Sequence, residues 1–90
     1  MKADAQIVVP LLKTARGQLD AILRMVEEDK YCLDISHQLM SCEAIVKKAN
    51  REILRAHMES CVREAFESGS PEESQKKVDE LVELLARLSK

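Results

Sequence analysis

Three residues in this chain carry side chains that bind soft metal ions: Cys32, His57 and Cys61. His57 and Cys61 are four residues apart, so on a helix their side chains lie one above the other and can hold one ion. A single pair of this kind is a weak signal. A lone cysteine on a helix is more often a small buried apolar residue, and a lone histidine near a helix end is more often a surface or capping group.

Cys32 cannot join the other two residues within one chain. It lies 29 residues before Cys61, about 43 Å along a continuous helix at ~1.5 Å per residue, whereas the ligands of one ion lie close together. Two antiparallel copies related by a two-fold axis near Ile45 or Val46 would instead place Cys32 of one chain beside His57 and Cys61 of the other. Such a dimer would hold two identical sites.

Each of these sites would offer two sulfur atoms and one imidazole nitrogen. This soft donor set suits monovalent copper in trigonal geometry better than it suits hard cations. Zinc would normally require a fourth ligand. The set of donor atoms therefore favours copper(I). Cys42 falls on an apolar helical stripe and is expected in the core, and His37 is expected in solvent.

Three helices must position these residues. Apolar residues recur at three- and four-residue spacing, which predicts a first helix from about residue 5 or 10 to about 28, with Pro10 suited to a first turn. The same spacing runs without Gly or Pro through residues 33–67, which predicts one helix of about 35 residues. Ser68-Gly69-Ser70-Pro71 then ends that helix and begins a third over residues 71–89.

The composition indicates one small all-α domain over residues 1–90. Two glycines, two prolines and two aromatic residues, beside 33% charged and 46% hydrophobic residues, are typical of long helices and argue against a sandwich, a barrel or a disordered tail. A helix of about 35 residues is about 50 Å long, which is too long for the other two helices to cover. Its exposed stripe predicts a bundle made from two chains.

Charge and hydropathy limit the location and the partners. The longest apolar run, residues 7–12, is shorter than the core of a signal peptide and far shorter than the ~18 residues that span a bilayer, so we expect a cytoplasmic protein with no membrane partner. An odd number of cysteines, three, argues against a disulfide framework. The net charge of −2 makes no general case for nucleic acid, so any DNA contact must rest on local basic patches. We do not expect an enzyme.

Several motifs between about residues 10 and 88 resemble one family of regulators. They are Arg16-Gly17-Gln18-Leu19, Met25-Val26-Glu27-Glu28-Asp29-Lys30-Tyr31-Cys32, Gln38, Ala49-Asn50-Arg51, and His57 with Cys61-Val62. The pattern closely resembles the CsoR/RcnR family of bacterial metal-sensing transcriptional repressors, including the spacing of the Cys, His, Cys set. Its copper-sensing branch implies copper(I) held by Cys32 of one subunit and by His57 and Cys61 of the other.

The resemblance also implies partners for the site and an assembly. Tyr31 and Glu80 match residues that hydrogen-bond to the non-coordinating side of the imidazole and link metal binding to movement of the third helix. The implied assembly is an antiparallel homodimeric four-helix bundle that pairs into a dimer of dimers, a homotetramer. A basic face on its first two helices binds operator DNA and releases it when the ligand binds. The candidates by position are Lys13, Arg16, Lys47, Lys48, Arg51 and Arg55.

One departure and two alternatives accompany this resemblance. Leu11 stands where the family usually has an arginine that is important for operator binding. Sulfide-sensing members keep only the two cysteines, so a per- or polysulfide sensor using Cys32 and Cys61 is one alternative, and His57 separates it from a copper sensor because sulfur chemistry does not require an imidazole. A helical metal-binding or interaction protein without DNA binding is the other, favoured by Leu11 and by the charge of −2.

Overall fold

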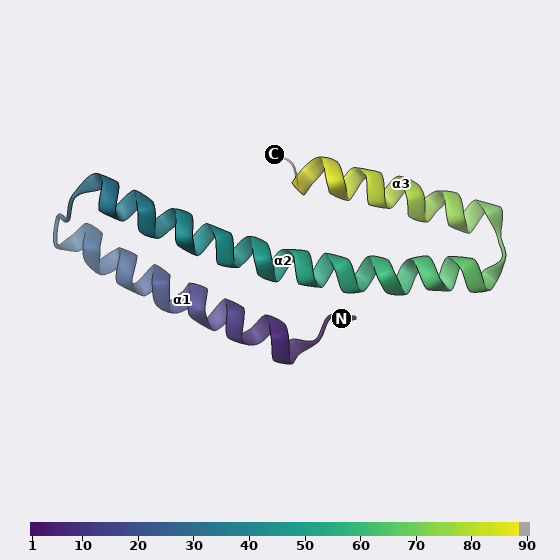
Figure 1. Cartoon of the computed structure of the whole chain (residues 1–90), viewed down its shortest axis with the longest axis horizontal. Coiled ribbons are helices and arrows are strands. Elements are labelled where there is room, and N and C mark those ends of the chain that lie inside the picture. Colours follow the sequence, from purple (N-terminus) through teal and green to yellow (C-terminus); the bar gives the residue numbers. More distant parts are fainter. Residues whose placement is uncertain (89–90) are drawn as a thin grey trace.

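The computed structural model describes residues 1–88, which form three helices lying side by side (Figure 1). Helix α1 spans Ala5–Glu27, α2 spans Cys32–Ser68 and α3 spans Pro71–Leu88. α1 runs antiparallel along the first half of α2, and α3 folds back along the second half, on the other side of α2 in this view. Within the described residues, α1 and α3 each contact α2 and do not contact each other. The three predicted helices are confirmed, and the predicted end of the third at residue 89 lies outside the described residues.

The start of α1 decides between the two predicted positions. The helix begins at Ala5, where the Asp4 side chain accepts a hydrogen bond from the Gln6 N–H at 2.8 Å. A side-chain acceptor at this position satisfies an amide that would otherwise lack a partner. Pro10 therefore lies inside the helix, where it forgoes one backbone hydrogen bond. The start at residue 5 is confirmed, and the start at residue 10 with Pro10 in the first turn is wrong because a good N-cap precedes the proline.

Two tight turns connect the helices. After α1, Asp29 adopts the left-handed conformation (φ 55°), and backbone N–H groups of the turn bond back to carbonyls of the last helical turn, as in the Schellman arrangement. α2 ends at Gly69, also left-handed (φ 65°), as predicted from the sequence. The Ser70 hydroxyl then accepts a hydrogen bond from the Glu73 N–H at 3.4 Å and begins α3.

A core of buried residues lies between α1 and α2. Ala15, Ile22 and Cys42 are buried there, and Ile35 and Ile45 pack against them. The Cys42 thiol donates a hydrogen bond to the Ala15 carbonyl oxygen at 3.6 Å. The prediction that Cys42 is a core residue is therefore confirmed.

Most large apolar side chains lie outside this core. The molecule measures 59 × 27 × 13 Å, and its shortest dimension is close to the ~10–12 Å diameter of one helix. Charged residues interrupt the apolar ones, and no described helix is long and apolar enough to cross a membrane. A layer one helix thick leaves apolar surface that another protein chain can cover. The exposed side chains include Ile7, Leu12, Leu19, Leu23 and Val26 on α1, Leu33, Leu39, Met40 and Val46 on α2, and Val78, Val82, Leu85 and Leu88 on α3.

Candidate metal centre

His57 and Cys61 lie together on the second half of α2, as their spacing predicts. The Cys61 Sγ is 3.4 Å from the His57 Nε2, with Cys61 buried and the His57 side chain 46% exposed. A metal ion ~2.3 Å from a sulfur and ~2.0 Å from a nitrogen separates these two donor atoms by about 3.5–3.7 Å. The observed separation is close to that value, so the pair fits a single ion with little rearrangement.

Cys32 and Tyr31 lie at the opposite end of α2. Cys32 is the first residue of the helix and Tyr31 is its N-cap, and both are exposed. The helix rises ~1.5 Å per residue, so Cys32 is about 37 Å from His57 along its axis. Within residues 1–88, no three His, Cys, Asp or Glu side chains come together in a way that could hold a metal ion. A site with all three predicted ligands therefore requires a second chain.

Glu80 connects α3 to the His57 ring. Its Oε1 lies 3.3 Å from His57 Nε2, and its Oε2 lies 3.5 Å from Lys77 Nζ. The hydrogen bond with His57 holds the pKa of the Glu80 carboxyl below its ordinary value, and the charge of Lys77 acts in the same direction. Electrostatic interaction with Cys61, followed by that with Glu80, raises the pKa of Lys77. Both carboxylate oxygens of Glu80 therefore have a partner, His57 on α2 and Lys77 on α3.

The Glu80 contact involves the same ring nitrogen as the Cys61 contact. The resemblance implies that Glu80 meets the side of the imidazole away from the metal, whereas the structure places Glu80 Oε1 and Cys61 Sγ near the same His57 nitrogen, Nε2. A neutral imidazole has one N–H and one nitrogen lone pair. Nε2 can therefore donate to Glu80 or bind a metal, but not both at once. Metal binding must either displace Glu80 or use Nδ1.

Lys77 belongs to this cluster, although the sequence does not predict a role for it. It precedes Glu80 by three residues, a spacing at which opposite charges meet on a helix. That signal is weak in the sequence because other charged pairs have similar spacing, such as Glu83 with Arg87. The packing of α3 on α2 is what brings Lys77 near the metal-ligating candidates.

The basic candidates for DNA contact are all exposed, on α1 and α2. Ala15, which lies between Lys13 and Arg16 in the sequence, contacts Cys42 on α2, five residues before Lys47. Lys47 forms an ion pair with Glu43 at 3.3 Å. In the described part of the chain, four of the six form no ion pair: Lys13, Arg16, Lys48 and Arg51.

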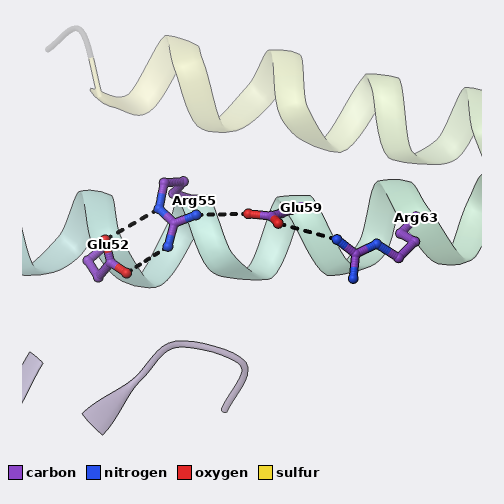
Figure 2. A network of polar contacts seen from close by, with 4 residues as sticks. All are labelled: Glu52, Arg55, Glu59 and Arg63. Atoms are coloured by element: carbon purple, nitrogen blue, oxygen red, sulfur yellow. Dashed lines mark hydrogen bonds and ion pairs between the residues drawn. The ribbon is translucent and has the colours of Figure 1, made fainter. Parts of the chain in front are cut away.

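Arg55 differs from the other five because carboxylates already surround its guanidinium (Figure 2). Its Nε and Nη2 lie 3.3 and 2.8 Å from the two oxygens of Glu52, and its Nη1 lies 2.8 Å from Glu59. Glu59 also accepts a hydrogen bond from Arg63 at 3.3 Å. The hydrogen bonds between Arg55 and Glu52 lower the pKa of Glu52 and raise that of Arg55. Arg55 is therefore less available to a phosphate than Arg51.

Comparison with known proteins finds that this chain is similar to several transcriptional repressors. The family described as "Metal-sensitive transcriptional repressor" matches residues 4–87. The copper-sensing transcriptional repressor CsoR of Mycobacterium bovis is 39% identical over 83 residues, 92% of this chain and 67% of that protein. CsoR of Bacillus subtilis is 34% identical over 79 residues, 88% of this chain and 75% of that protein. CsoR of Mycobacterium ulcerans is 43% identical over 72 residues, which are 80% of this chain but only 59% of that relative's length.

A solved structure shares the fold. The nickel-responsive transcriptional regulator InrS superposes with a TM-score of 0.80 at 25% identity, over 98% of this chain and 96% of that one. Proteins named for copper and for nickel thus resemble the same three-helix chain, so the fold alone does not choose the metal. These relatives are named as regulators and not as enzymes. The match over residues 4–87, with relatives at 34–43% identity, shows that this chain belongs to the family of metal-sensitive transcriptional repressors.

Proposed function

We propose that this protein is a cytoplasmic copper(I)-responsive repressor that releases operator DNA when copper binds between two subunits. Each site uses Cys32 of one subunit with His57 and Cys61 of the other. The observation that carries the proposal is the 3.4 Å separation of Cys61 Sγ and His57 Nε2, which suits one ion. The relatives named as copper sensors support the choice of metal.

The donor set also favours copper(I) over nickel(II). Two thiolates and one imidazole form a soft, three-coordinate set, whereas nickel(II) favours square-planar or tetragonal sites built from nitrogen and oxygen. Bound copper(I) would join the three side chains into one unit across the subunit boundary. The chain's own residues place the donor atoms close together, and Glu80 connects His57 to α3.

The exposed apolar face supports an antiparallel dimer as the unit that builds the site. A two-fold axis near Ile45 or Val46 places the α2 helices of two chains side by side and antiparallel. It brings Cys32 of one chain level with the His57 and Cys61 pair of the other. Leu19, Leu39 and Val46 are 45–48% exposed in the single chain, and this dimer covers them. α1 and α2 of both chains then make a four-helix bundle. Pairing of two such dimers into a tetramer follows the family resemblance.

Metal binding is coupled to DNA through α3. His57 Nε2 faces both Cys61 and Glu80. Glu80 would therefore leave Nε2 if that nitrogen held the copper ion, and it would follow the turning ring if Nδ1 held the ion. Either event changes how α3 rests on α2. We assign the loss of DNA affinity to this change, which makes copper binding and DNA binding mutually unfavourable.

Replacing Glu80 with glutamine is expected to separate copper binding from DNA release. The amide keeps the shape of the side chain but loses the charge that meets His57, so copper(I) affinity should stay within about threefold of wild type while the effect of copper on DNA affinity falls by about fivefold or more. Fluorescence anisotropy of labelled operator DNA, with and without copper(I), measures the difference. Glu83→Gln, which disturbs only the exposed pair with Arg87, is the matched control. If the Glu80→Gln protein releases operator DNA as fully as the wild type when copper(I) is added, Glu80 does not couple copper binding to DNA release.

Two neighbouring arginines on α2 are expected to contribute differently to DNA binding. Arg51 forms no ion pair in the described chain, so Arg51→Met should weaken operator binding and reduce the slope of log affinity against log salt by about 0.9, as for one lost phosphate contact. Arg55 is held by Glu52 and Glu59, so Arg55→Met should leave that slope nearly unchanged. Titrations at several salt concentrations check both. Equal slope changes for the two variants would contradict this assignment.

A promoter-binding experiment tests the proposed function as a whole. Reduced protein is mixed with labelled DNA from upstream of its own gene at low salt, and copper(I) is then added. The wild type should bind the DNA and release it, while Cys32→Ala should bind and not release. If no fragment is bound even at low salt, the protein is a helical metal-binding or interaction protein without a DNA function.

A further inference from the structure

We propose that Lys77 is a positioning residue of the metal site, which holds the Glu80 carboxylate in the orientation that contacts His57. The contact itself is a property of the single chain. Its effect on DNA release rests on the function proposed above. Lys77 offers no donor atom to a metal while it is protonated, so its role is indirect.

The geometry of the Glu80 carboxylate carries this inference. One oxygen lies 3.3 Å from the ring of His57 on α2, and the other lies 3.5 Å from the ammonium of Lys77 on α3. A carboxylate held at both oxygens has its plane fixed, whereas one held at a single oxygen can turn into water. Lys77 therefore determines how often Glu80 faces His57.

The surroundings of Lys77 distinguish it from an ordinary surface lysine. Its side chain is 27% exposed, and it lines an apolar hollow between α2 and α3 together with Val62, Phe66 and Leu81. Packing of the aliphatic stem limits the positions that the ammonium can reach. The pair of Glu83 with Arg87 offers a contrast, because both side chains are at least 66% exposed. Among the ion pairs of residues 1–88, only the Lys77 pair includes a carboxylate that also meets a metal-ligating candidate.

Nuclear magnetic resonance of the imidazole nitrogens in the reduced, full-length protein tests the contact without copper or DNA. Lys77→Met keeps the unbranched stem and removes the charge, so the Nε2 resonance of His57 should shift, while Lys77→Arg should keep it near the wild-type position. His37 is exposed on α2 and provides an internal reference in the same spectrum. Lys76→Met removes a neighbouring exposed lysine and should change neither histidine. An unchanged His57 signal in Lys77→Met, or an equal shift in Lys76→Met, overturns the proposal.

Copper-dependent DNA release gives a second readout. In Lys77→Met, the effect of copper(I) on DNA affinity should be about two- to fivefold smaller than in the wild type, as expected for a partly exposed ion pair. Copper affinity should stay within about threefold of wild type. Combined with Glu80→Gln, Lys77→Met should lose no more of this effect than Glu80→Gln alone, because the two act through one contact. Independent, additive losses contradict this. Lys77→Gln replaces Lys77→Met if circular dichroism shows that the latter does not fold. If the wild type shows no copper-dependent release, the proposed function fails, while the resonance of His57 still decides the role of Lys77.

Discussion

Replacing His57 with alanine is expected to weaken copper(I) binding by about 100-fold or more and to leave sulfur-bridged crosslinking between Cys32 and Cys61 of two subunits unchanged. Loss of an outer partner of a metal ligand already costs 10- to 100-fold in affinity, so loss of a ligand should cost at least as much. The two thiols remain in place in this variant. Anaerobic competition with a copper(I) chelator measures the affinity, and a non-reducing gel after polysulfide treatment measures the crosslink.

His37→Ala is the matched control for this experiment. His37 is the second histidine of the chain and is exposed on the same helix, so its removal should affect neither readout. A His57→Ala protein that binds copper as tightly as the wild type would contradict the assignment of the imidazole as a ligand. Combined with efficient crosslinking, that result would favour a per- or polysulfide sensor that uses the two cysteines alone.

A charge at the centre of α2 is expected to dismantle the assembly and the metal site together. Val46 is 45% exposed in the single chain and lies near the proposed two-fold axis, so Val46→Glu places two like charges close together in an apolar interface. The variant should sediment as a monomer at micromolar concentration. Its copper affinity should fall about as far as that of Cys32→Ala, because one chain holds only two of the three ligands.

Lys48→Glu controls for the added charge. Lys48 is exposed two residues further along α2 and forms no ion pair in the described chain. Because residues two apart on a helix lie on different faces, its side chain points away from that of Val46. This variant should keep the wild-type assembly and copper affinity. A monomeric Val46→Glu protein that binds copper like the wild type would show that the site does not lie between subunits.

The helices could be predicted from the sequence because each boundary is a local event. Gly69 at a left-handed position ends α2, and the apolar spacing runs to that point without interruption. The weaker element was the start of α1, where Pro10 suggested a later first turn. Asp4, six residues before Pro10, supplies a side-chain acceptor for the first turn, and the helix tolerates the proline inside it. A cap depends on the hydrogen bond that actually forms, which spacing alone does not determine.

The candidate site was predictable only where its residues share one helix. The His57 and Cys61 pair follows from a four-residue interval on α2. The contact of Glu80 with His57 joins two helices, so only the family resemblance indicated it, and the shared nitrogen became apparent only from the structure. Lys77 was missed for the same reason, since its place beside the site depends on how α3 packs on α2. The family resemblance gives Arg55 as a candidate for DNA contact by its position, and its ion pairs with Glu52 and Glu59 leave the guanidinium less available to a phosphate.

X-ray absorption at the copper edge, recorded on reduced wild-type protein with one equivalent of copper(I) per chain, identifies the atoms that coordinate the copper. The proposal predicts a three-coordinate site with two sulfur atoms and one nitrogen, and loss of the nitrogen in His57→Ala. It also predicts that this three-coordinate signature is lost when Val46→Glu separates the chains. Coordination by sulfur alone, unchanged by His57→Ala, would contradict an intersubunit copper site built from Cys32, His57 and Cys61.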